Sequence, residues 1–173
     1  MGEDDAMTAT VRPMRERDLA SVLLWRNALE VRRYMYNQDE IGLDQHRHWF
    51  AGVEADSKRH ALIAETADGP IGFVNIAELH QGVASWGFYA VPGSPRGAGV
   101  ALGAAALHHA FDILRLHKLC GEALADNLRS VRFHERLGFH DEGTLRSHRL
   151  VAGVYRDVRC FGLLAEEWRA ASR

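Results

Sequence analysis

Neither sign of charge dominates this chain, which has 21 Lys and Arg against 23 Asp and Glu and a formal net charge of −2. A dedicated nucleic-acid-binding domain usually carries a basic excess, so the composition disfavours that class. No apolar run approaches the ~20 residues that cross a membrane, and the acidic start MGEDDAMTAT lacks the apolar core of a signal peptide. We therefore expect a soluble, cytoplasmic protein that binds neither nucleic acid nor membrane.

Cysteine is also scarce. The two cysteines, Cys120 and Cys160, lie far apart in apolar stretches, which is typical of reduced thiols rather than of a disulfide framework. Histidine is more frequent, but His46 and His48 point apart on a predicted helix, and no cluster of His, Cys and Asp has metal-ligand spacing. We expect no metal site.

What the chain has is a regular alternation of apolar patterns, and we expect a single domain over residues 1–173. The periodicity predicts the order β-α-α-β-β-β-α-β-α-β-β. This order indicates an α/β (α+β) fold, with a mixed, largely antiparallel sheet of six to seven strands and about four flanking helices. The predicted strands are 8–14, 59–66, 71–79, 83–91, 118–125, 139–151 and 154–164. The predicted helices are 16–30, 43–55, one that follows the glycine-rich stretch and ends at about 117, and 127–138, with an irregular segment at 31–42.

A glycine- and alanine-rich stretch, PRGAGVALGAAAL at 95–107, follows three consecutive strands and opens a helix. Such a stretch serves either close helix packing or phosphate binding, because bare backbone N–H groups at a helix start can approach anionic oxygens. It matches neither the dinucleotide-binding fingerprint nor the P-loop, which requires Gly-Lys-Ser/Thr. The pattern that remains is R-x-x-G-x-A, from Arg96 to Ala101.

A second motif follows at the expected distance: Asn127, Ser130, Phe133-His134 and Leu137-Gly138-Phe139. Together with the order of elements, these motifs resemble the GNAT N-acetyltransferases. The resemblance implies that two central strands splay apart, that acetyl-CoA is the co-substrate, and that pantetheine pairs with the freed strand edge. It implies cofactor contacts from Tyr89, Ala90, Val91, Arg96, Gly97, Ala98, Gly99, Val100, Ala101, Asn127, Ser130 and Phe133.

Segments 25–50, 122–146 and 154–168 resemble one branch of this family, the N-acetyltransferases that modify UDP-4-amino-4,6-dideoxy-N-acetyl-altrosamine in pseudaminic acid synthesis. This implies a nucleotide-linked amino sugar as the acceptor. The implied substrate-side residues are Arg26, Met35, Tyr36, His46, Trp49 and Tyr89.

The spacing of Arg26 from Leu19 and Val22 places its guanidinium on the apolar face of the predicted helix. A buried cation needs a partner. That partner is either a carboxylate such as Asp157 or Glu40, or a ligand oxygen that the guanidinium fork would anchor.

For the chemistry, a backbone N–H near Tyr89–Val91 is expected to bind the thioester oxygen as charge develops. A carboxylate or a histidine, reached through water, is expected to take the amine proton, and Glu122 is the first candidate. His134 stands where many family members have a tyrosine, so it is the candidate acid for the departing thiolate, or else it only packs beside the pantetheine.

Two other functions stay open. One is a protein N-terminal acetyltransferase of the ribosomal-protein type, which needs an open peptide groove, and the other is a non-catalytic acyl-CoA-binding module. The resemblance also allows a homodimer through the last strands.

Overall fold

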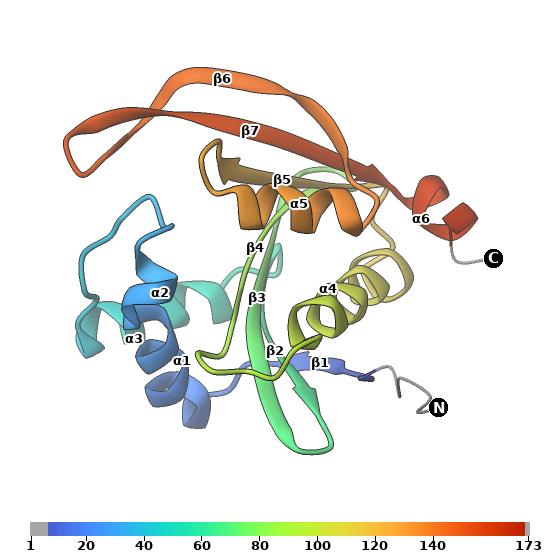
Figure 1. The fold of residues 1–173 in the computed structure, drawn as a ribbon. Helices are drawn as coiled ribbons and strands as arrows, with labels where there is room; N and C mark the ends of the chain where they lie inside the picture. Colours follow the sequence, from blue (N-terminus) through green and yellow to red (C-terminus); the bar gives the residue numbers. More distant parts are fainter. Residues whose placement is uncertain (1–6, 172–173) are drawn as a thin grey trace, which may run out of the picture.

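The computed structural model describes residues 7–171, and within them one seven-stranded sheet forms the centre of the molecule (Figure 1). The strand order is β1-β2-β3-β4-β5-β7-β6, and only β4 and β5 run parallel. The strands are β1 (Thr10–Pro13), β2 (Arg59–Thr66), β3 (Gly69–His80), β4 (Val83–Ala90), β5 (Lys118–Leu124), β6 (His140–Val151) and β7 (Val154–Leu164). The predicted fold class is confirmed.

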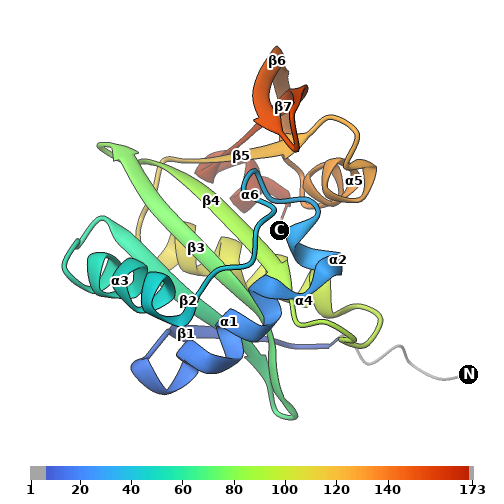
Figure 2. The same cartoon turned by 90° about the vertical axis from the view of Figure 1, so that its left-hand side faces the viewer.

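Helices cover both faces of this sheet (Figure 2). The helices α1 to α3 lie on one face, and α4 lies on the other, with α5 beside it (Figures 1 and 2). The helices are α1 (Leu19–Asn27), α2 (Leu29–Arg32), α3 (Leu43–Glu54), α4 (Ala98–His108), α5 (Leu128–Arg136) and α6 (Ala165–Ala171), with a 3-10 turn at Glu16–Asp18 and a π-helical turn at His109–Ile113. None of the helices within residues 7–171 is long and apolar enough to cross a membrane.

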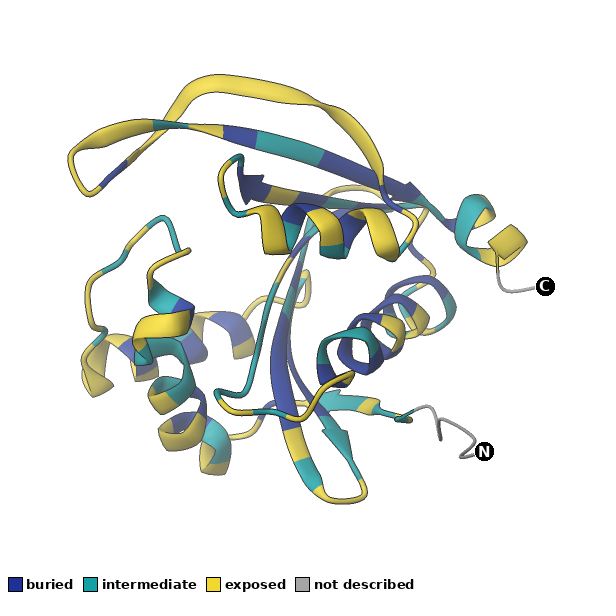
Figure 3. Ribbon diagram, in the orientation of Figure 1, coloured by how far each residue is buried: buried dark blue, intermediate teal, exposed yellow. Residues whose placement is uncertain are grey.

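Three apolar clusters hold these layers together. The largest lies between the sheet and α4 and includes Phe111 and Leu119, both with 0% exposure. The second lies between the sheet and α1 and α3, around Val22 and Ile63. β7 contributes Phe161 and Leu163 to the largest cluster, whereas eleven of the twelve residues of β6 are exposed (Figure 3).

The sheet opens into a V at its centre. β4 and β5 are paired only from Val83 to Ser85 and from Lys118 to Cys120, so the rest of β4 has no strand on that side. In consequence β1–β4 form one half of the sheet and β5–β7 form the other.

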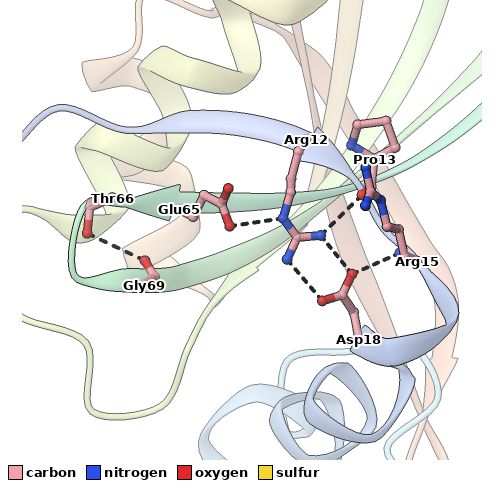
Figure 4. Close-up of polar contacts among 7 residues, drawn as sticks. All are labelled: Arg12, Pro13, Arg15, Asp18, Glu65, Thr66 and Gly69. Atoms are coloured by element: carbon pink, nitrogen blue, oxygen red, sulfur yellow. Dashed lines mark hydrogen bonds and ion pairs between the residues drawn. The ribbon is translucent and has the colours of Figure 1, made fainter.

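An ion-pair network ties β1 to its neighbours in the first half (Figure 4). The Arg12 guanidinium donates two hydrogen bonds to Asp18, at 2.7 and 3.0 Å, and one to Glu65 at 2.9 Å. Hydrogen bonding to Arg12 holds the pKa of the Asp18 carboxyl below its usual value. Arg12 is therefore occupied in holding the 3-10 turn at Glu16–Asp18 and β2 to β1. At the far end of β2, the Thr66 hydroxyl donates to the Gly69 carbonyl across the turn.

The helix boundaries differ from the predicted ones in three places. The predicted helix 16–30 is interrupted at Ala28, whose ψ of 134° is extended and separates α1 from α2. The predicted helix to about 117 ends at Ile113 in a π-helical turn. The predictions also lack α6, which begins directly after β7, and whose Glu167 carboxylate accepts a hydrogen bond from the Leu164 N–H.

Candidate active site

The open side of the V is continuous with a cavity of about 1220 Å³ that reaches from the first turn of α4 to the segment after α2. The two halves of the sheet, the helices α1, α3, α4 and α5, and the β6 strand all contribute to its lining. Of the residues predicted to form the site, all but Ala101 and His134 line it.

The glycine-rich stretch forms the loop and first turn at the N-terminus of α4. Gly97 has φ of +93°, a left-handed conformation that favours glycine, and it is the N-cap of the helix. The first N–H groups of a helix have no partner within it, and they favour an anion at this end. Arg96 and the residues from Gly97 to Val100 line the cavity here. Ala101 does not, because it points into the core and is 6% exposed.

The start of α5 faces the same part of the cavity. The Asn127 side chain caps this helix by accepting a hydrogen bond from the Ser130 N–H at 3.2 Å. Asn127, Ser130 and Phe133, for which cofactor contacts are predicted, line the cavity, and so do three arginines that the predicted site did not include. These are Arg129, Arg132 and Arg136. Their spacing of three and four residues is the signal that places them on one face of the helix.

A backbone N–H near Tyr89–Val91 is expected to bind the thioester oxygen, and the pairing of β4 with β3 narrows the choice of this donor. The Val91 N–H donates to the Ile71 carbonyl at 2.8 Å, so it is not available to a ligand. Hydrogen-bonding groups of adjacent residues in an antiparallel strand point to opposite edges. The N–H of Ala90 therefore faces the open edge, whereas that of Val91 faces β3.

His134 lies behind the cavity wall and does not reach the cavity. Its side chain is 1% exposed and stacks on Phe161, with ring centroids 4.6 Å apart. Its Nδ1 lies 2.8 Å from the Ser130 carbonyl oxygen, to which it donates. Burial lowers the pKa of His134, so the imidazole is neutral near pH 7. The predicted general acid is thus a buried neutral side chain that packs on Phe161 behind the residues that line the cavity.

At the other end of the cavity, Arg26 has no carboxylate partner among residues 7–171. Its Nη2 donates to the Asn37 carbonyl at 2.7 Å, and its Nη1 is buried without a hydrogen-bond partner. Glu40 instead pairs with Arg32, and Asp157 accepts from the Ser147 N–H. The ion-pair alternative for Arg26 is wrong within the described residues, and the ligand-anchor alternative stays a prediction.

Aromatic side chains form the wall next to Arg26. His46 stacks on Trp49 with centroids 5.2 Å apart, Trp49 meets the edge of Phe73, and Phe73 stacks on Tyr89 at 5.1 Å. Burial lowers the pKa of His46 and raises that of Tyr89. This wall is therefore made of neutral rings at pH 7.

Buried polar atoms without partners gather at this cavity. Within the described residues, six buried side-chain atoms lack a hydrogen bond, and four of them belong to residues that line it. These four are Arg26 Nη1, His46 Nε2, Asn75 Oδ1 and Trp86 Nε1. An unsatisfied buried polar group is costly, so these four atoms have unused hydrogen-bonding capacity next to the cavity. Asn75 was missed, although a lone amide within the apolar strand 71–79 is a readable signal.

Tyr36, Met35 and Glu122 complete the acceptor end of the cavity. The Tyr36 hydroxyl donates to Glu122 Oε2 at 2.7 Å, which joins the segment after α2 to β5. Burial, followed by this hydrogen bond, raises the pKa of Tyr36 above its usual value.

Comparison with known proteins decides the family. The sequence profile of the acetyltransferase (GNAT) domain matches residues 9–140. The chain belongs to the GNAT acetyltransferase family. It is an acetyl-CoA-dependent N-acetyltransferase, as the two motifs predicted.

Individual relatives of this GNAT enzyme are distant. The probable N-acetyltransferase YjcK of Bacillus subtilis is 29% identical over 117 residues, which are 65% of each chain. The spermidine N(1)-acetyltransferase of Vibrio cholerae is 23% identical over 163 residues, 92% of this chain and 94% of the relative. A crystal structure of the Vibrio cholerae spermidine N-acetyltransferase with CoA and spermine superposes with a TM-score of 0.86, over 94% of this chain and 98% of that one, at 23% identity.

These comparisons bear on two further expectations. They give no support to the narrower resemblance to the pseudaminic acid branch. For metals, the part of this GNAT enzyme from residue 7 to 171 holds no group of three or more His, Cys, Asp or Glu side chains arranged to bind an ion.

Proposed function

We propose that this enzyme, as one domain over residues 1–173, acetylates the primary amine of a nucleotide-linked amino sugar. The observation that carries the proposal is the unpaired Nη1 of Arg26, buried at the acceptor end of the cavity. A guanidinium fork suits phosphate oxygens, and the neutral rings of His46, Trp49 and Tyr89 suit a flat base and an apolar sugar substituent. Asn75 Oδ1 would accept a hydrogen bond from the same ligand.

The charges at this end favour such an acceptor over a polyamine. Arg26 and Arg149 line it on the basic side, against Glu30 and Glu122 on the acidic side. A substrate with several ammonium groups needs an excess of carboxylates and is repelled by an unpaired arginine. The Vibrio cholerae relative is named for spermidine, so a polyamine remains the second candidate, with Glu30 and Glu122 as its carboxylates.

The residues have separate tasks in the proposed reaction. One proton of the substrate ammonium moves to Glu122, and the neutral nitrogen then attacks the thioester carbon. The Ala90 N–H donates to the thioester oxygen as negative charge develops there. The C–N bond forms and the C–S bond breaks, the leaving thiolate is balanced by the second nitrogen proton, and Glu122 releases its proton to solvent.

Arg96, the N-terminal turn of α4 and the arginines of α5 are proposed to hold the phosphates of acetyl-CoA. The positive φ at Gly97, the helix N-terminus at Gly99 and Val100 and the arginine side chains fit a pyrophosphate, whereas the Ala98 N–H already donates to the Pro95 carbonyl. Release of the CoA thiol measured with candidate amines tests the proposal. UDP-4-amino-4,6-dideoxy-N-acetyl-altrosamine should be the preferred acceptor over spermine, aminoglycosides and N-terminal peptides. Preference for spermine would establish the polyamine alternative, and no thiol release with any amine would favour a binding module.

The variant Arg26→Met sharpens this test, with Arg33→Met as its control. Arg33 is exposed and does not line the cavity. Loss of a charge-assisted hydrogen bond costs about 1.5–3 kcal/mol, so the KM for the nucleotide sugar should rise roughly ten- to a hundredfold in Arg26→Met. The KM for acetyl-CoA should stay near the wild-type value, as should both constants in Arg33→Met. Equal KM values for the nucleotide sugar in both variants would contradict the proposal that Arg26 binds this substrate.

A further inference from the structure

Tyr36 connects two parts of the molecule that are far apart in the sequence. It lies in the segment between α2 and α3, which rises toward the β6–β7 hairpin in Figure 1. It packs against the buried cluster of Leu124 at the end of β5 with Val151 and Val158 of that hairpin. The Arg149 guanidinium of β6 lies 4.4 Å from the centre of the Tyr36 ring. Tyr36 is thus fixed by packing on one side and by a cation on the other.

The Tyr36 hydroxyl, held in place in this way, donates a hydrogen bond to the Glu122 carboxylate. An exposed glutamate samples several rotamers, and ordering it costs free energy. Among residues 7–171, no lysine, arginine or histidine forms an ion pair with Glu122, and the hydrogen bond from Tyr36 to Oε2 is what orients the carboxylate. Oε1 is left to accept a proton from an amine in the cavity.

We propose that Tyr36 is a positioning residue that holds Glu122 in the orientation that accepts the amine proton, and that Arg149 of the β6–β7 hairpin holds Tyr36. This inference rests on the proposed function, because Glu122 is the base only if the chain acetylates an amine in this cavity. Tyr36 keeps its own proton throughout, since its raised pKa makes it a donor and not a base. The hairpin thereby becomes part of the active site through a residue that its exposed sequence does not reveal.

A double-mutant cycle tests the proposal, with Tyr36→Phe, Glu122→Gln and the double variant. Tyr36→Phe removes only the hydroxyl and should lower kcat about tenfold, with little change in the KM for acetyl-CoA. In the Glu122→Gln background the same change should have almost no further effect, because Tyr36 acts through Glu122. Tyr155→Phe, on the exposed part of β7, serves as the control and should retain the wild-type kcat. Effects of Tyr36→Phe and Glu122→Gln that simply multiply would overturn the proposal.

The cycle is measured in two series, with UDP-4-amino-4,6-dideoxy-N-acetyl-altrosamine and with spermine. Activity in the spermine series alone contradicts the proposed acceptor and leaves this inference to be judged by the coupling in that series. The two failures are therefore distinguishable.

A second measurement needs no acceptor and no folded Tyr36 variant. The chain has only four tyrosines, so their ring Cζ signals can be followed by NMR in protein with 13C-labelled tyrosine. Glu122→Gln should shift the Tyr36 signal and leave that of Tyr155 unchanged. A Tyr36 signal that does not respond to Glu122→Gln would show that the hydrogen bond is absent in solution and would overturn the inference.

Discussion

His134 is a titratable side chain enclosed by aromatic rings. The rings of Trp86 and Phe139 lie nearly perpendicular to it, Phe161 stacks on it, and its Nε2 has no hydrogen-bond partner. Burial lowers its pKa in the folded protein, whereas in the unfolded chain an imidazole titrates near 6.5. The unfolded state therefore binds the proton more readily, and stability that is complete above about pH 7 is lost as the pH falls through 6.5.

This position allows a prediction for His134→Phe, which keeps a ring against Phe161 and removes the titrating group. The free energy of unfolding should fall less steeply between pH 7 and pH 5 in the variant, by at most about 1.4 kcal/mol per pH unit. Denaturant unfolding at several pH values measures this. Turnover should stay close to wild type, since the side chain does not reach the cavity. A general acid contributes roughly 10²–10⁴-fold, so a loss of that size would restore the acid role to His134.

At the scale of single elements, the first turn of α4 carries the contact proposed for the phosphates of acetyl-CoA. A Cβ added at Gly99 would lie 3.8 Å from Phe133 Cε2, an ordinary contact. Gly99→Ala should therefore fold and bind acetyl-CoA normally. A longer side chain in Gly99→Leu projects into the cavity between α4 and Phe133, and the Kd for acetyl-CoA should rise at least about tenfold. Calorimetry measures both, and tight binding by Gly99→Leu would rule out this turn as the phosphate site.

Elements with a clear period were predictable from the sequence. The strand predicted at 59–66 has these same bounds in β2, and the helix predicted at 43–55 differs from α3 by one residue. The break at Ala28 was not predictable in this way, because alanine has a high helix propensity and only tertiary packing makes its ψ extended. The short helix α6 was also missed, since its seven residues give no apolar period.

The motifs of the candidate site were predictable from the sequence, but which of their side chains reach the cavity was not. Asn127, Ser130 and His134 share one face of a helix, and that much follows from their spacing. The spacing does not say, however, which of these side chains reach the cavity. Arg136 lies further along α5 and lines the cavity, whereas His134 is buried against Phe161. Arg149 was unpredictable for another reason, because only the path of the β6–β7 hairpin brings it to Tyr36.

At the scale of the whole molecule, the sheet consists of two halves joined along three residue pairs of β4 and β5. The proposed acetyl-CoA site takes the edge of β4 and the start of α4 from the first half, and α5 from the second. A ligand that contacts both halves stabilises their arrangement as well as binding to it. The strand pairing that joins the two halves is thus short, and the co-substrate is expected to strengthen their junction.

The stabilisation by acetyl-CoA can be measured as a rise in the midpoint temperature of thermal unfolding. Acetyl-CoA at a hundred times its Kd contributes about 2.7 kcal/mol, which for a domain of this size corresponds to roughly 5–11 °C. Gly99→Leu at the same concentration should show little of this rise.

Hydrogen exchange shows where acetyl-CoA acts. The Ala90 amide, on the open edge of β4, should become protected from exchange when acetyl-CoA binds. The Val91 amide already donates to Ile71 and should change far less. Equal changes at the two amides would mean that the ligand tightens the sheet generally and does not pair with the edge of β4.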